Sequence, residues 1–182
     1  LSRVKWLGAN RCAVPEAAWP CSTDYRRVGG PCSDPQLWAC GQVRRTADGL
    51  LFNSRMVKYH YLGDEQSVCE HVKYLVKARG QVIACLAWSS APRHLKLRDH
   101  YLGWSDQARE RKVHLLAYNT RFLILPWVRV PHLASHILGR MAKLVPEDWQ
   151  RLYAHPIYWL ETFFDTTRFA GKGVMPLPIP VP

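Results

Sequence analysis

The sequence lacks any uncharged apolar run of the roughly 18 to 20 residues that a membrane-spanning helix needs. Its first ten residues lack the basic segment, apolar stretch and small-residue cleavage site that together mark a secretory signal. These two absences predict a cytoplasmic protein with no membrane partner.

Closely paired cysteines are also missing. None of the six cysteines stands in a Cys-x-x-Cys pair, the spacing at which a tight turn presents two thiolates to one zinc ion. No metal site is therefore expected. Cys12, Cys21, Cys32 and Cys40 lie close enough in sequence to leave a disulfide or metal cluster open, although free thiols are the favoured interpretation for a cytosolic chain.

Acidic residues are scarce. Lys and Arg number 25 against 14 Asp and Glu, which gives a formal net charge of +11. Such an excess favours polyanionic partners: nucleic acid first, then an acidic protein or membrane surface. A basic surface that is merely solvated remains the alternative.

Composition divides the chain into three parts. Residues 1–48 are rich in Pro, Gly, Cys and Arg without a sustained period and predict an irregular basic arm. Residues 49–171 carry the periodic apolar patterns of a folded domain. In residues 172–182 alternating prolines, which can neither continue a helix nor donate to a β-ladder, predict an extended tail.

Within the central part, helical spacing of apolar residues predicts a helix from about 51 to 62. Alternation over 72–76, a turn at 77–80 and an apolar run over 82–88 predict a hairpin. A helix over 66–76 remains the alternative for the first half of this segment. Ser105 is a good N-cap for a short helix that ends at Lys112.

The last third predicts strand, helix and strand. The strands are expected near 121–128 and 157–164, and the helix, with Pro131 in its first turn, from 131 to about 145. A strand–helix–strand unit implies parallel pairing and a sheet covered by helices. We therefore expect an α/β fold with a mixed central sheet and helices on both faces.

The junction before this helix reads Leu125-Pro126-Trp127-Val128-Arg129-Val130-Pro131-His132-Leu133-Ala134-Ser135. It resembles the loop with which GCN5-related acyltransferases hold the coenzyme A pyrophosphate at a helix N-terminus. The resemblance implies an acyltransferase-like core and a candidate anion or cofactor junction. However, His132 replaces a glycine and Pro131 removes an N–H donor, so no cofactor is expected, with acyl-coenzyme A as the alternative. The candidate junction residues are Arg129, Val130, His132, Leu133, Ala134 and Ser135.

Several blocks resemble the DruA family of the Druantia anti-phage system, whose members also occur near transposase genes. They read Tyr59-His60-Tyr61-Leu62-Gly63, Gly103-Trp104-Ser105, Asn119-Thr120-Arg121-Phe122-Leu123-Ile124-Leu125-Pro126-Trp127-Val128-Arg129-Val130-Pro131, Leu133-Ala134-Ser135-His136 and Glu161-Thr162-Phe163. The resemblance spans about residues 50–171. Because the family pattern usually continues where the proline-rich tail stands, we expect the closing C-terminal strands to be missing or replaced.

Two polar residues near the central strands are the catalytic candidates, Glu161 and Tyr118. Glu161 stands in an apolar strand, so its carboxylate is expected to face solvent, to pair with Arg121 or Arg129, or to have a raised pKa. His132 and His136 lie one helical turn apart, but no third metal ligand is evident.

A basic, aromatic-rich stretch over 93–112 is the candidate nucleic-acid surface, because cations neutralise phosphates while aromatic faces of Trp88, Tyr101 and Trp104 can stack on unpaired bases. The leading hypothesis is a non-enzymatic, nucleic-acid-engaging component of prokaryotic defence or transposition that works with other such proteins. An acyl-coenzyme A-dependent transferase and a protein-binding or inert fragment are the alternatives. The candidate residues of the surface are Arg93, Lys96, Arg98, Trp104, Arg109, Arg111 and Lys112.

Overall fold

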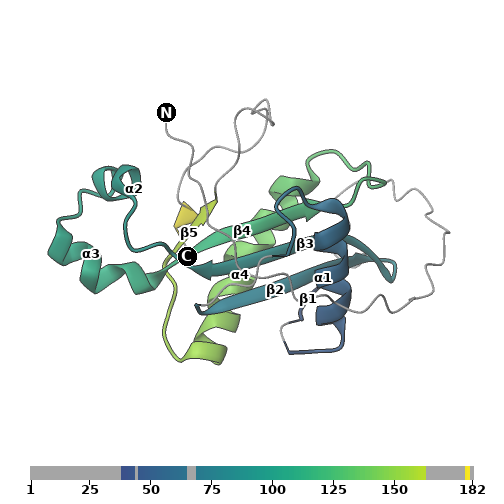
Figure 1. Cartoon of the computed structure of the whole chain (residues 1–182), viewed down its shortest axis with the longest axis horizontal. Coiled ribbons are helices and arrows are strands. Elements are labelled where there is room, and N and C mark those ends of the chain that lie inside the picture. Colours follow the sequence, from purple (N-terminus) through teal and green to yellow (C-terminus); the bar gives the residue numbers. More distant parts are fainter. Residues whose placement is uncertain (1–37, 44, 65–68, 163–178, 181–182) are drawn as a thin grey trace.

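The computed structural model describes residues 38–43, 45–64, 69–162 and 179–180, and within these ranges six strands form one sheet in chain order (Figure 1). The expected α/β fold with a mixed sheet is confirmed. The strands are β1 (Trp38–Gln42), β2 (His71–Ala78), β3 (Gln81–Ser90), β4 (Leu116–Ile124), β5 (Trp159–Thr162) and β6 (Ile179–Pro180). The α-helices are α1 (Asp48–Tyr59), α2 (Lys96–Tyr101), α3 (Asp106–Lys112) and α4 (Leu133–Tyr153), and a 3₁₀ turn covers Val113–Leu115.

The first four strands form an antiparallel meander. The β2–β3 hairpin is confirmed, and its closing pair is Ala78 and Gln81. The two loop residues, Arg79 and Gly80, both have positive φ (50° and 79°), as the tightest hairpin turn requires. The alternative helix over 66–76 is wrong for residues 71–76, because these residues lie in β2 and pair with β3, and residues 74–76 also pair with β1.

The strand–helix–strand unit near the C-terminus is also confirmed. β4 and β5 are parallel neighbours, with Tyr118 opposite Glu161 in the register, and α4 connects them. The strand expected near 121–128 is displaced, since β4 begins at Leu116 and ends at Ile124.

α4 differs from its prediction at both ends. Pro131 precedes the helix, and His132 caps it in a left-handed conformation (φ 57°). The helix continues past Val145 and through Pro146 to Tyr153. A proline in a helix interior loses one backbone hydrogen bond. Here the apolar face continues to Trp149, whose side chain is fully buried, and this packing maintains the helix across the proline.

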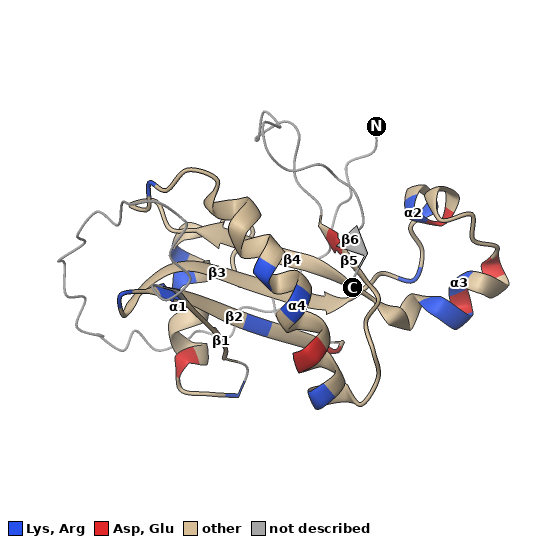
Figure 2. Ribbon diagram, turned by 180° about the vertical axis from the view of Figure 1, so that it is seen from behind, with Lys and Arg blue, Asp and Glu red and all other residues tan. Residues whose placement is uncertain are grey.

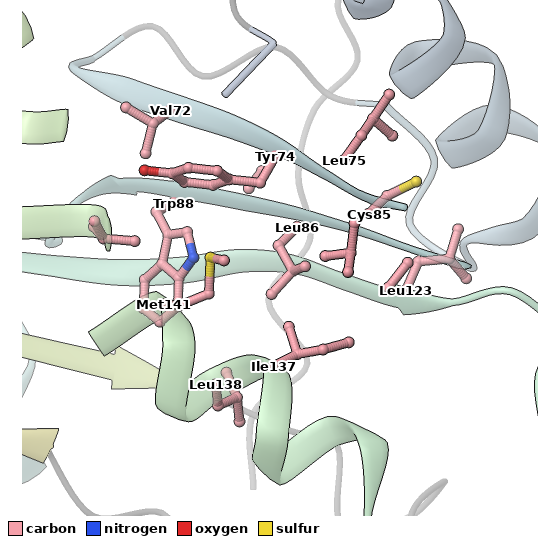
Figure 3. Close-up of a cluster of buried hydrophobic side chains, with 14 of the residues drawn as sticks. Val72, Tyr74, Leu75, Cys85, Leu86, Trp88, Leu123, Ile137, Leu138 and Met141 are labelled. Carbon is pink, nitrogen blue, oxygen red and sulfur yellow. The ribbon is translucent and has the colours of Figure 1, made fainter. Parts of the chain in front are cut away.

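The sheet lies between two helices, with α1 on one face and α4 on the other (Figures 1 and 2). Ile137 and Met141 of α4 point towards Leu86 and Trp88 of β3 (Figure 3), and all four side chains are buried. Phe52 and Met56 of α1 are fully buried on the opposite side. The central strands β2 and β3 are thus covered on both faces, which explains the unbroken apolar run of β3 over 82–88. β2 differs, since Lys73 and Lys77 alternate with its buried residues.

At both edges of the sheet, a strand forms in a segment that the sequence placed outside the folded domain. Residues 38–42, placed in the irregular arm from sequence, form the edge strand β1 against β2. Within the proline-rich tail, Ile179 and Pro180 form β6, antiparallel to β5. Residues 1–37 of the arm and most of the tail lie outside the described residues. Strand pairing at each edge depends on partners far away in sequence, which composition does not reveal.

Candidate nucleic-acid interface

Residues 91–115, here called the lobe, connect β3 to β4 and carry α2 and α3. Adjacent antiparallel strands need only a two-residue turn, so the lobe is an insertion into a hairpin. It projects beyond one end of the sheet (Figures 1 and 2). At the base of the lobe, the backbone N–H of Ala91 donates to the carbonyl of Leu116 over 3.1 Å. This hydrogen bond joins the end of β3 to the start of β4.

A buried charge cluster holds the lobe together. The Arg98 side chain is only 3% exposed. Its Nε donates to Asp99 Oδ1 over 3.0 Å, and its Nη1 donates to the carbonyl of Pro92 over 2.9 Å. Arg109 of α3 reaches the second Asp99 oxygen at 3.4 Å and Asp106 at 2.6 Å. Asp99 therefore joins the two helices of the lobe.

The α3 helix begins as its sequence predicts. The Ser105 side chain accepts a hydrogen bond from the N–H of Ala108 (3.3 Å), and Asp106 stands in the first turn. Both features complement the unpaired N–H groups and positive dipole of a helix start. α2 has no such cap and only six residues. Because so short a helix is unstable alone, the contacts of Arg98 and Asp99 must stabilise it.

Glu161 lies where β5 meets the lobe. Its Oε2 is 3.7 Å from Arg98 Nη1, is buried, and makes no hydrogen bond to any described residue. Burial raises the pKa of the Glu161 carboxyl above its usual range; Arg98 opposes this rise and Asp99 adds to it. Of the expected environments, the raised pKa agrees with the structure, whereas solvent exposure does not.

The expected Arg partner of Glu161 was the wrong one. Arg98, which the sequence assigned to an exposed basic face, is the cation beside it. Arg121 instead donates through Nε to the carbonyl of Gly63 (3.0 Å), and Arg129 is exposed. The sequence offered one unused signal: Asp99 is an isolated acid within a basic run, a typical arrangement for an internal ion pair.

The candidate surface residues therefore separate into two groups. Arg98 and Arg109 are internal to the lobe, and Trp104 is half-buried. The exposed cations have no carboxylate partner among the residues that the structure describes. They are Arg93, Lys96, Arg111 and Lys112. Figure 2 shows basic and acidic positions along α2 and α3 of the lobe.

The three aromatic residues considered for base stacking also differ. Trp88 is 1% exposed and packs in the core beneath α4, so it cannot stack on a base. Tyr101 is 62% exposed on α2. The sequence carried a signal that separates the two cases, because Trp88 ends the apolar run over 82–88 whereas Tyr101 follows the charged and polar stretch Arg98-Asp99-His100. Tyr101 is the aromatic residue of the lobe with a well-exposed ring.

The junction before α4 is placed as expected between a strand and a helix start. Leu133 is buried and Val130 is half-buried, whereas Arg129, His132 and Ser135 are exposed. His132 has the left-handed backbone that glycine adopts most easily, which explains why related junctions carry glycine there. Ala134 is half-buried in the first turn.

The catalytic candidates Tyr118 and Glu161 are brought to paired positions on the parallel strands β4 and β5. Tyr118 is half-buried. The sequence analysis did not predict a second cluster of polar residues. In it, His155 Nε2 lies 2.9 Å from Glu70 Oε2, and Ser90 Oγ donates to the same oxygen over 3.3 Å. These residues are far apart in sequence, so no local motif marks them.

Metal ligands and thiols can be assessed only in the described ranges. There, no three His, Cys, Asp or Glu side chains are placed to hold a metal ion. Cys40, Cys69 and Cys85 are free thiols, and burial raises the pKa of Cys85 to about 12. Cys12, Cys21 and Cys32 lie outside the described residues. The helices of the described part are all too short or too polar to span a bilayer.

The architecture defines an α/β protein with an open mixed sheet and a charged helical insertion. Residues 38–175 match the model of a family described as Druantia protein DruA. The match covers most of the sequence, so this chain belongs to the DruA family. It begins at β1, earlier than the resemblance seen in the sequence. No curated protein matches the chain. Membership of this family indicates a role in Druantia anti-phage defence.

Proposed function

We propose that the chain serves Druantia defence by engaging nucleic acid through the lobe, without catalysing a reaction. The observation that carries this proposal is the division of the lobe's cations. Arg98 and Arg109 are used internally with Asp99, while Arg93, Lys96, Arg111 and Lys112 remain exposed. Exposed Lys and Arg that need no internal partner can neutralise phosphates and release their counterions.

The position of the lobe supports the same function. It projects from the end of the sheet, where a long polyanion can approach without meeting the body of the domain (Figure 1). The net charge of +11 adds long-range attraction. Other defence or transposition proteins are the proposed partners on the remaining surface, and the cytoplasm is the proposed location.

We also propose that the sheet is a variant of the acyltransferase-like fold. An antiparallel meander followed by a parallel β4–α4–β5 crossover supports this relationship. The lobe between β3 and β4 is then an addition to that fold. A shared fold does not carry a shared reaction, and a binding role on such a scaffold is consistent with the buried position of Glu161.

Salt dependence of binding tests the proposal. Fluorescence anisotropy of a labelled duplex should give a linear log–log plot of affinity against salt, with a slope of about −0.9 per contacted phosphate. The double variant Arg111→Ala/Lys112→Ala should make this slope shallower by about one to two, whichever duplex sequence is used.

The matched control removes two exposed cations outside the lobe, Arg79 in the β2–β3 turn and Lys143 on α4. Arg79→Ala/Lys143→Ala changes the net charge equally and should leave the slope unchanged. If the two double variants change the salt slope equally, nucleic acid is attracted by the overall positive charge and not by the lobe in particular. Absence of binding at low salt would reject nucleic acid as the partner.

A further inference from the structure

The outward face of α2, formed by Lys96, Leu97, His100 and Tyr101, places two large apolar side chains in water. Leu97 is 82% exposed, the highest value among the large hydrophobic side chains of the described residues, and Tyr101 is 62% exposed. They are four residues apart and therefore lie on one side of the helix. Lys96 and His100, both exposed, stand next to them on the same outward face.

The opposite side of α2 fixes this orientation. Arg98 and Asp99 are buried and bonded to each other, to Pro92 and to Arg109. Rotating the helix to bury Leu97 and Tyr101 would expose these charges and break the cluster. The apolar pair is therefore held outward by the contacts that stabilise the lobe.

Exposed apolar residues scattered singly are common and need no explanation. This pair differs in its setting, because Lys96 lies on the same outward face and the other exposed cations belong to the same projecting insertion. An aromatic ring beside positive charges matches a nucleobase attached to phosphates, and an aliphatic residue next to it can fill the space left by an unstacked neighbour.

The size of the patch decides between partners. A stable protein interface takes about 800 Å² from each side. A fully buried aromatic side chain contributes only about 150–250 Å², so two partly exposed side chains on a six-residue helix fall well short of a protein interface. One or two bases are the better match in area.

We propose that Leu97 and Tyr101 form a stacking platform for unpaired nucleobases, which gives the lobe a preference for single strands over duplex. This inference rests on the proposed nucleic-acid function and names its substrate class. The exposed lobe cations hold the phosphates on either side, and the platform receives a base that duplex DNA keeps within its stack.

The test compares single-stranded and blunt duplex oligonucleotides of equal length, using the full chain. Stacking on an aromatic ring changes single-strand affinity by about 5- to 150-fold when the ring is removed. Tyr101→Ala should weaken single-strand binding within this range, with little change in duplex affinity or salt slope. Tyr101→Phe should retain binding, because stacking needs the ring and not the hydroxyl. Leu97→Ala should have a smaller effect in the same direction.

The matched control is Val57→Ala, an apolar residue of α1 that is 69% exposed and lies outside the lobe. It should change neither affinity. A 2-aminopurine base in the single strand should change its fluorescence on binding to the native chain but not to Tyr101→Ala. Circular dichroism and thermal unfolding confirm that each variant is folded.

The possible outcomes distinguish failure of the stacking platform from failure of the proposed nucleic-acid function. If binding depends on Arg111 and Lys112 but not on Tyr101, the stacking platform is rejected and the proposed nucleic-acid function still holds. Equal losses for single strand and duplex in Tyr101→Ala also overturn the platform. No binding to either oligonucleotide rejects both. Binding of the native chain to anionic vesicles, lost in Leu97→Ala and Tyr101→Ala while oligonucleotide binding persists, would assign the pair to a membrane surface instead.

Discussion

At the scale of single residues, Glu161 shows what burial does to a carboxyl group. Its Oε2 faces Arg98 at 3.7 Å, too far for a hydrogen bond, and lies out of contact with water. Desolvation then outweighs the attraction of Arg98, and the pKa rises. A buried ion pair of this kind adds little net stability, so we expect the charged form of Glu161 to lower the free energy of unfolding.

Replacing Glu161 by Gln tests this interpretation. Because its pKa is raised in the folded state, the native protein binds this proton more tightly than the unfolded chain does. Its contribution to the free energy of unfolding is therefore largest below the ordinary value near pH 4.5 and falls as the pH rises through the folded pKa. We expect the urea midpoint of Glu161→Gln, relative to the native chain, to increase from pH 4.5 upward and then level off.

Glu110→Gln, at an exposed carboxylate of α3, is the matched control, because it makes the same substitution outside the buried cluster. If Glu161→Gln instead loses stability relative to the native chain as the pH rises above 4.5, the attraction of Arg98 dominates. The carboxylate would then be held charged.

At the scale of elements, the lobe depends on polar contacts more than on an apolar core. α3 has no buried residue, and the two buried residues of α2 are Arg98 and Asp99. Removing one partner of a buried pair leaves the other charge unsatisfied, at a cost of about 3–5 kcal/mol. This penalty should fall on the lobe and on the end of β5 that carries Glu161, since the hydrophobic core lies between α1, the sheet and α4.

Arg98→Met should therefore open the lobe locally. Limited digestion with trypsin should cut within residues 93–112 many times faster than in the native chain, while β2, β3 and α4 stay protected. Arg111→Met, which also removes one exposed cleavage site, should not accelerate the remaining cuts. Unchanged digestion of the Arg98 variant would show that backbone contacts suffice to hold the lobe.

At the scale of the whole molecule, the junction before α4 decides whether this sheet also binds a nucleotide cofactor. A helix start attracts anions through its free N–H groups, and the first turn of α4 carries no acidic residue. His132 places a side chain where close approach of phosphate requires glycine, however, and Pro131 has no N–H to offer.

We expect acetyl-coenzyme A to leave the thermal unfolding of the intact chain unchanged up to millimolar concentration. A ligand present at 100 times its dissociation constant would stabilise the native state by about 2.7 kcal/mol, which is readily measured. A bound oligonucleotide should raise the midpoint and serves as the positive control. A saturable shift at micromolar acetyl-coenzyme A would restore the transferase hypothesis and assign Glu161 and Tyr118 a chemical role.

Local signals in the sequence determined much of this fold. Alternation over 72–76, a turn at 77–80 and an apolar run over 82–88 predicted the β2–β3 hairpin, although residues 77 and 78 of that turn belong to β2. Ser105 predicted the start of α3. The apolar stripe of α4 predicted the parallel crossover. Each signal acts over a few residues, through backbone preference or side-chain periodicity, so the sequence alone expresses it. The family could also be identified from the sequence alone, because ungapped blocks such as residues 119–131 resemble the family pattern without any structural information.

Only the tertiary structure shows which charged side chains are exposed and can contact a partner. Arg93 and Arg98 look alike in the basic run, yet one is exposed and the other is buried beside Asp99 and Glu161. The edge strands β1 and β6, and the passage of α4 through Pro146, were settled in the same way. Ion pairing, burial and strand pairing depend on groups that the fold brings together from distant positions, and no local pattern contains that information.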